Sequence, residues 1–114
     1  MPQFLYRLQP TRLGMLTDAP TEREAQVLGE HFACLSELAD RGAVLMAGRT
    51  LTADDRTFGI AVLVASTVAE AEAIMNDDPA VKHGVMRAEL FPYRVALWSK
   101  SGPSPEPSPE KHHG

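Results

Sequence analysis

The stretch between Pro20 and Gly42 predicts the longest helix of the chain and constrains the fold more than any other segment. Thr21 and Glu24 have the spacing of a capping box at its start, and Gly42 favours the left-handed backbone that ends a helix. Apolar residues recur at gaps of three and four, the period of one helix face. They are Ala25, Leu28, Phe32, Leu35, Leu38 and Ala39. At about 100° per residue, His31 then projects from the edge of this stripe.

Four segments have the patterns of β-strands, and a second helix lies between the third and the fourth. The expected strands are residues 3–8, 43–51, 57–65 and 85–98, with a loop over 11–20. Thr67 and Glu70 are spaced to cap the second helix, which should end before Pro79 because the residue preceding a proline avoids helical geometry. The order β-α-β-β-α-β predicts an α+β, ferredoxin-like fold: a four-stranded antiparallel sheet with two helices on one face.

The third expected strand is apolar at every position of residues 60–64. Such a run predicts a central strand that is covered on both of its faces. The two helices would cover only one face of the sheet. Because an uncovered apolar surface favours association, we expect a homodimer that is joined through the sheet faces.

Composition excludes several classes of protein. The length of 114 residues fits one domain, which we place at residues 1–100, and the Pro/Ser/Glu-rich residues 101–114 are expected to be a disordered tail. The net charge of −4 argues against a nucleic-acid partner, and no apolar run is long enough to span a membrane. The single cysteine, Cys34, excludes an internal disulfide and is interpreted as a small, half-buried side chain rather than a nucleophile. No secretory signal is visible, so the expected location is cytoplasmic.

The segment 76–98, NDDPAVKHGVMRAELFPYRVALW, resembles the YciI-related (YCII domain) family. The resemblance covers residues 3–98. Its matching pieces are His31 before an apolar turn, Gly42 followed by a strand, the helix start at 67–71, and the segment from Asp78-Pro79 to Gly84 that leads into a strand with Pro92. It implies a dimeric α/β barrel in which His31 and Asp78 line a cleft as an acid/base pair. Some relatives dechlorinate hydroxylated aromatic compounds.

The fold would bring His31 and Asp78 together, because the first helix lies beside the connection that follows the second. A carboxylate within hydrogen-bonding reach would orient the imidazole, and histidine is suited to proton transfer in enol–keto isomerisation or HX elimination. Two alternatives stay open. His31 can be a boundary histidine bonded to a backbone carbonyl, and Asp78 can be a turn-forming or helix-capping residue ahead of Pro79.

Three further residues are weaker candidates for substrate binding. Arg49 could hold an anionic substrate group, although solvated arginines at strand edges are commoner. Tyr6 could supply a hydroxyl to a cleft, although core packing with the hydroxyl at the surface is more usual for such a tyrosine. His83 lies near Asp78 in the sequence. A metal site built from His31, Asp78 and His83 lacks any characteristic ligand spacing, so we expect neither a metal nor a cofactor.

Two functions are compatible with these observations. The first is a cofactor-free enzyme, a lyase or an isomerase, that uses His31 and Asp78 on a small cyclic or aromatic compound. The second is a non-catalytic dimeric module that binds a small ligand or serves as an accessory protein. The sequence contains no phosphate-binding glycine loop, CxxC motif or nucleophile elbow that would indicate other chemistry.

Overall fold

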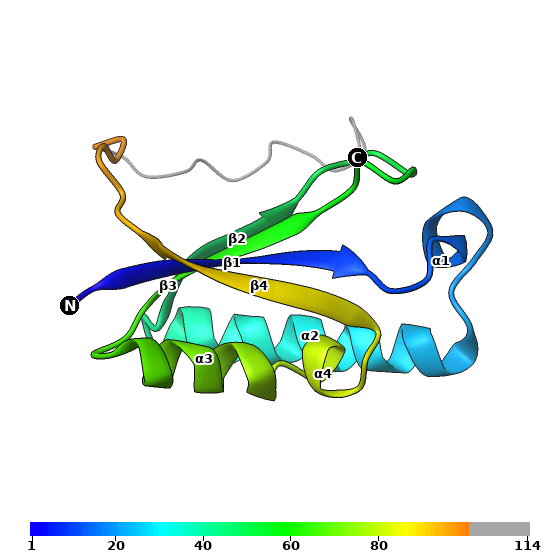
Figure 1. Cartoon of the computed structure of the whole chain (residues 1–114), viewed down its shortest axis with the longest axis horizontal. Helices are drawn as coiled ribbons and strands as arrows, with labels where there is room; N and C mark the ends of the chain where they lie inside the picture. Colours follow the sequence, from blue (N-terminus) through cyan, green and yellow to red (C-terminus); the bar gives the residue numbers. More distant parts are fainter. Residues whose placement is uncertain (101–114) are drawn as a thin grey trace.

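The computed structural model describes residues 1–100 of the chain, and the predicted disordered tail at 101–114 lies outside this range (Figure 1). The elements in chain order are β1 (Gln3–Pro10), α1 (Gly14–Thr17), α2 (Glu22–Asp40), β2 (Val44–Arg49), β3 (Gly59–Val64), α3 (Val68–Asp77), α4 (Pro79–Lys82) and β4 (Met86–Tyr93). Within the described residues, no helix combines the length and apolar character needed to cross a membrane.

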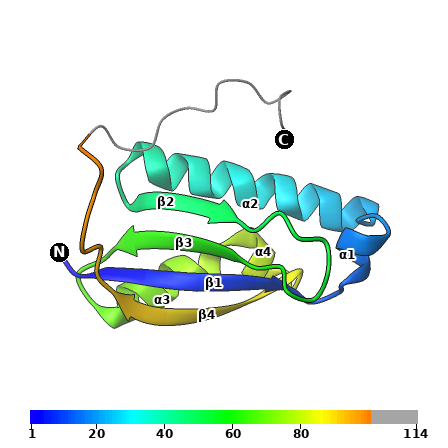
Figure 2. The same cartoon turned by 90° about the horizontal axis from the view of Figure 1, so that it is seen from above.

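The four strands form one antiparallel sheet in the order β2-β3-β1-β4. The helices α2, α3 and α4 lie together on one face of this sheet (Figures 1 and 2). The predicted α+β, ferredoxin-like arrangement is therefore confirmed, and β3 is a central strand as its apolar run indicated. Pro92 lies in β4, which is an edge strand, where a missing backbone donor does least harm.

Two predictions about individual segments were wrong. The last strand ends at Tyr93, not at residue 98, because Tyr93 pairs with Gln3 at the very start of β1 and little strand remains beyond it to pair with. The expected loop at 11–20 contains the short helix α1, and its Met15 is buried against Val27 and Val85. The apolar character of this connection is thus explained by packing at one end of the core.

The capping box of α2 is present as predicted. The backbone N–H of Glu24 donates to the Thr21 hydroxyl at 3.1 Å, and the N–H of Thr21 donates to the Glu24 carboxylate at 2.8 Å. Arg12 binds the same carboxylate with two hydrogen bonds of 2.8 and 2.7 Å, which fastens the connection from β1 to the start of α2. At the other end Gly42 has φ +79°, the left-handed conformation that favours glycine.

The inward stripe of α2 differs from the predicted one. Phe32 is 72% exposed, so it is not a core residue of the described chain. Glu24 and Val27 are buried instead, and His31 lies within the half-buried part of the helix rather than at its edge. The reason is that polar residues enter the stripe where a side chain from another segment binds them. Arg12 binds Glu24, and His31 has a partner described below.

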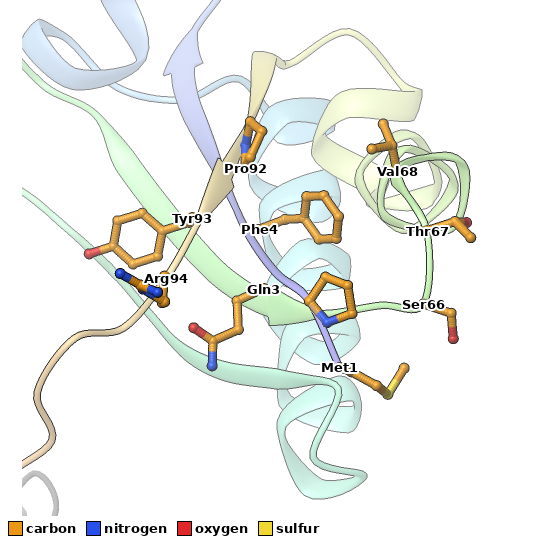
Figure 3. Close-up of a pocket in the computed structure, with 10 residues that line it drawn as sticks. Met1, Gln3, Phe4, Ser66, Thr67, Val68, Pro92, Tyr93 and Arg94 are labelled. Carbon is orange, nitrogen blue, oxygen red and sulfur yellow. The ribbon is translucent and has the colours of Figure 1, made fainter.

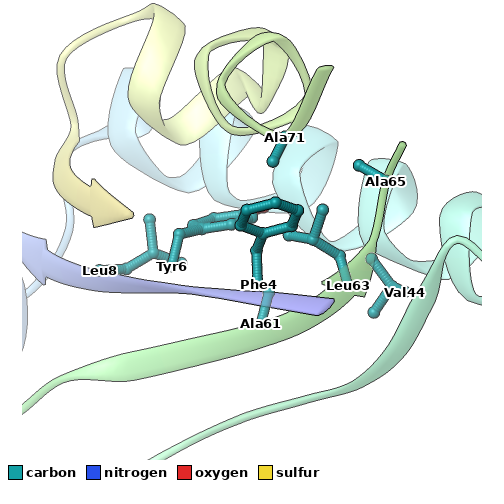
Figure 4. Close-up of a cluster of buried hydrophobic side chains, with 8 residues drawn as sticks. All are labelled: Phe4, Tyr6, Leu8, Val44, Ala61, Leu63, Ala65 and Ala71. Atoms are coloured by element: carbon teal, nitrogen blue, oxygen red, sulfur yellow. The ribbon is translucent and has the colours of Figure 1, made fainter. Parts of the chain in front are cut away.

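The core lies between the sheet and the helices. Phe4, Tyr6 and Leu8 of β1 rise from one face of the sheet, and Ala71 of α3 closes over them (Figure 4). Residues that alternate with these point to the other face, which carries no helix of the described chain (Figure 1). We define the open face by a cross-strand row that the register places on it: Met46, Val62, Leu5 and Phe91.

Candidate functional site

Asp78 occupies the junction between α3 and α4, and its backbone conformation follows from the proline after it. With φ −59° and ψ +124° it leaves helical geometry, as expected for a residue before a proline, so α3 ends and α4 begins at Pro79. Its side chain turns into the space under the sheet and is 1% exposed. One buried carboxylate is thereby placed between α2 and β1.

His31 of α2 lies directly against this carboxylate. Its ring Nδ1 is 2.7 Å from Oδ1 of Asp78. The His31 side chain remains 17% exposed, whereas the Asp78 side chain is 1% exposed. The pair therefore has a solvent-accessible member and a buried member, and Nδ1 is the ring atom that faces the carboxylate.

Asp78 also caps the short helix α4. Its Oδ1 accepts the backbone N–H of Ala80 at 3.0 Å. The helix-capping interpretation of Asp78 is thus confirmed, and the same oxygen faces His31 at the same time. For His31, the partner is this carboxylate and not a backbone carbonyl.

Tyr6 completes the surroundings of the carboxylate. Its hydroxyl donates to Oδ2 of Asp78 at 2.7 Å, and the residue has no exposed surface. Burial above all, and then the negative charge of Asp78, raise the pKa of the Tyr6 hydroxyl far above its usual range. The sequence pattern placed Tyr6 on the strand but did not indicate this bond. The available signal was an inward tyrosine on a central strand, because a buried tyrosine hydroxyl needs a hydrogen-bond partner.

The other sequence candidates lie apart from this cluster. Arg49 is exposed at the end of β2, and His83 is exposed just after α4. Cys34 lies half-buried on α2, and burial above all, with a further contribution from the charge of Asp78, raises the pKa of its thiol. A raised pKa disfavours the thiolate, which fits the interpretation of Cys34 as a packing residue.

No three His, Cys, Asp or Glu side chains within residues 1–100 gather as a metal site would require. Two pockets in the described part of the chain also lie elsewhere. A pocket of about 580 Å³ lies beside the start of β1, lined by Phe4, Thr67 and Tyr93 among others (Figure 3). A smaller one of about 220 Å³ is lined by residues that include Thr11 and Arg87. Neither is lined by Tyr6, His31 or Asp78.

Comparison with known proteins places this chain in a family. A search of curated proteins gave no match. Among solved structures, the chain is similar to the 5-chloro-2-hydroxyhydroquinone dehydrochlorinase from Burkholderia phenoliruptrix AC1100, in complex with 2,5-dihydroxybenzoquinone. The TM-score is 0.61 at 21% identity, over 89% of this chain and 99% of that chain, which establishes a shared fold. The family model of the YCII-related domain matches residues 8–94, a range that includes both His31 and Asp78. The chain therefore belongs to the YCII-related domain family.

Proposed function

We propose that the protein is an enzyme in which His31 and Asp78 act as an acid/base pair on a small cyclic or aromatic compound. The observation that carries this proposal is the 2.7 Å contact between Nδ1 of His31 and the buried Asp78 carboxylate. A partly exposed imidazole that is held by a buried carboxylate is an arrangement suited to general acid–base chemistry. In this proposal Asp78 orients the ring, and His31 meets the substrate.

The contact with Asp78 determines which ring nitrogen of His31 is available to take a proton from the substrate. An ionised carboxylate only accepts, so Nδ1 is assigned as the donor in this contact, and Nε2 then carries the lone pair in the neutral ring. Nε2 takes a proton from a carbon or hydroxyl of the substrate, and the electron pair of that broken bond forms a new double bond. In an elimination from a chlorinated polyhydroxybenzene, His31 first returns this proton to the chlorine-bearing carbon, which gives the keto tautomer with a tetrahedral C–Cl centre. Nε2 then takes the proton of a second ring hydroxyl, the electron pair of that O–H bond forms a C=O bond, a ring double bond shifts, and chloride leaves with its bonding pair. His31 gives this second proton to water, so that the net loss is HCl. In an isomerisation, His31 returns the proton to another atom of the same compound.

The structural neighbour supports a choice of first substrates. Its name describes removal of hydrogen chloride from a chlorinated hydroxyhydroquinone, and its structure holds a dihydroxybenzoquinone. Chlorinated polyhydroxybenzenes are therefore the compounds to assay first with this protein. Loss of chloride from such a ring is an HX elimination, one of the two reactions that a single acid/base pair performs.

We also propose that two copies of the chain associate through the open face. The row Met46, Val62, Leu5 and Phe91 crosses all four strands on the side away from the helices. Met46 is 40% exposed and Phe91 is 37% exposed, both at the edges of this apolar row. Burying exposed apolar side chains is a driving force for association.

Chloride release from 5-chloro-2-hydroxyhydroquinone tests the enzymatic proposal. We expect the wild-type protein to release chloride above the rate without protein, and His31→Ala to lower kcat by about 100-fold or more. Glu30→Ala is the matched control, because Glu30 is an exposed neighbour on α2 whose recorded contact is a 3.4 Å bond from Gln26. The proposal fails if His31→Ala turns over substrate at the wild-type rate, or if it loses activity only because it no longer folds.

A non-catalytic ligand-binding module is the second candidate, and one observation favours it. The larger pocket lies at the start of β1 and α3, away from His31 and Asp78, and Phe4 and Val68 line it. This function predicts that 2,5-dihydroxybenzoquinone raises the Tm of His31→Ala as much as that of the wild type. Neither this compound nor 5-chloro-2-hydroxyhydroquinone should be turned over. Val68→Glu should then abolish the shift.

A further inference from the structure

Tyr6 brings a polar group into the centre of the core. The residue is fully buried between Phe4 and Leu8 on β1, and its ring lies under the helices with the other core side chains (Figure 4). A hydroxyl in such a place must find a hydrogen-bond partner, because an unpaired one destabilises the fold. Its partner is Oδ2 of Asp78, at 2.7 Å and 72 positions away in the sequence.

The two oxygens of Asp78 are divided between different donors. Oδ2 accepts the Tyr6 hydroxyl, while Oδ1 faces both the Ala80 N–H and Nδ1 of His31. Among the residues that the structure describes, Tyr6 is the recorded donor to Oδ2. The carboxylate is therefore held from its far side by the sheet and from its near side by the two helical segments. Rotation of the carboxylate would break the Tyr6 bond and change the oxygen that His31 meets.

The chemistry of the groups around Asp78 determines which of them donates in each hydrogen bond. Burial and the charge of Asp78 keep the proton on the Tyr6 hydroxyl, so this hydroxyl is a donor. The N–H of Ala80 can only donate. An ionised carboxylate can only accept hydrogen bonds, so in the 2.7 Å contact with Asp78 we assign the ring proton to Nδ1 of His31.

We propose that Tyr6 is a positioning residue of the candidate site: its hydroxyl fixes the Asp78 carboxylate, which in turn keeps His31 in the tautomer with Nε2 free. The catalytic consequence of this inference rests on the proposed function. The structural consequence, which is the orientation and tautomer of His31, is independent of the proposed function. Tyr6 itself has no exposed surface and meets no substrate, so its effect passes entirely through Asp78.

Tyr6→Phe is the direct test, because it removes one oxygen and keeps the ring that fills the core. With ¹⁵N-labelled histidine, we expect the wild-type His31 ring to show the Nδ1-protonated form and Tyr6→Phe to shift toward the other tautomer. This measurement of the His31 ring needs no substrate, so it separates failure of this inference from failure of the proposed function. Where turnover is measurable, we expect kcat to fall by about tenfold or more with KM nearly unchanged, since a hydrogen bond to a charged group is lost.

Phe4→Leu is the matched control, because Phe4 belongs to the same core cluster on the same strand and has no hydrogen bond to Asp78. It should lower Tm without moving the His31 ring signals. Unchanged His31 signals in a folded Tyr6→Phe variant would overturn the inference, whatever the activity. If Tyr6→Phe does not fold, the wild-type protein still decides: the Tyr6 hydroxyl proton should exchange slowly with solvent and change its chemical shift in Asp78→Asn. A rapidly exchanging hydroxyl would equally reject the inference.

Discussion

The Asp78 carboxylate meets Nδ1 of His31 at 2.7 Å although 47 positions of sequence separate the two residues. The same oxygen of Asp78 caps α4 through the N–H of Ala80. Asp78 therefore contributes to the fold and to the candidate site at once, whereas His31 contributes its ring to the site from a partly exposed position. This difference lets mutations separate the structural contribution from the chemical one.

Asp78→Asn should destabilise the fold far more than the same change one residue earlier. The amide would present two donors and one acceptor to three groups that now donate to a carboxylate, so at least one buried bond is lost. We expect a loss of about 1–3 kcal/mol in the free energy of unfolding. Asp77→Asn, at the exposed end of α3, should change it by less than about 0.5 kcal/mol. Urea unfolding of the two variants makes the comparison, and equal losses would contradict it.

Tyr6 should not ionise while the protein is folded. The chain has two tyrosines, so Tyr93→Phe leaves Tyr6 as the single reporter of tyrosinate absorbance. Burial, followed by the charge of Asp78, raises the pKa of Tyr6 far above its usual range. The unfolded chain loses this proton above about pH 10 while the native protein keeps it, so the free energy of unfolding falls as pH rises beyond that point.

The measurement is an alkaline titration of Tyr93→Phe that follows ultraviolet absorbance and circular dichroism together. Tyrosinate should appear only as the circular dichroism signal is lost. The variant that combines Tyr6→Phe with Tyr93→Phe should lack this component of alkaline destabilisation. A reversible tyrosinate step with native circular dichroism would show that the hydroxyl is more accessible than the structure indicates.

The sequence alone went far toward the fold because its signals are local. The capping residues Thr21 and Glu24, the left-handed Gly42 and the proline after Asp78 each determine where a helix begins or ends. Strand patterns and element order were then sufficient for the sheet. The pair His31 and Asp78 was named through a family resemblance, and its contact distance depends on tertiary packing that no local pattern encodes.

Two features could not be read from local patterns. Phe32 was expected in the core because the search for a stripe counts apolar residues, yet it is 72% exposed. Glu24 lies in the inward stripe instead, and its burial is favourable only because Arg12 reaches it from another segment. Likewise Tyr6 was predicted as a strand residue that could supply a hydroxyl to a substrate, and its role as the donor to Asp78 depends on a contact 72 positions away.

The ion pair at the start of α2 should give the protein an acid-sensitive component of stability. The hydrogen bonds from Arg12 are the largest of the influences that lower the pKa of Glu24 to about 2. Its stabilising contribution is complete above the usual glutamate value of about 4.3 and is lost as pH falls through about 2. Glu24→Gln should therefore be less stable than wild type at neutral pH, and the difference should shrink between these two pH values.

Glu22→Gln is the control for this comparison, because Glu22 is also acidic, also lies in the first turn of α2 and is exposed. Removing it should affect the helix dipole but not the bond to Arg12. Thermal unfolding from pH 7 down to pH 2 compares the three proteins. A wild-type to Glu24→Gln difference that stays constant over this range would exclude the proposed linkage.

The open face should be the surface through which two copies associate. It contains an aromatic side chain, and an aromatic side chain on the opposite side of the molecule serves as the control. Phe91 lies at the edge of the apolar row beside Leu5 and is 37% exposed, whereas Phe32 lies on α2, in the helical layer. If two copies associate through the sheet, Phe91→Asp places a charge from each copy in the buried surface, and the complex should separate. Phe32→Asp, with the same change in chemistry, should leave the assembly intact.

Sedimentation equilibrium at micromolar concentration measures the mass of each protein. We expect a dimer for wild type and Phe32→Asp and a monomer for Phe91→Asp, with native circular dichroism in all three. A monomeric wild type would reject association through the open face. Dissociation by Phe32→Asp alone would move the interface to the helical layer, and the apolar row across the four strands would then need a different partner.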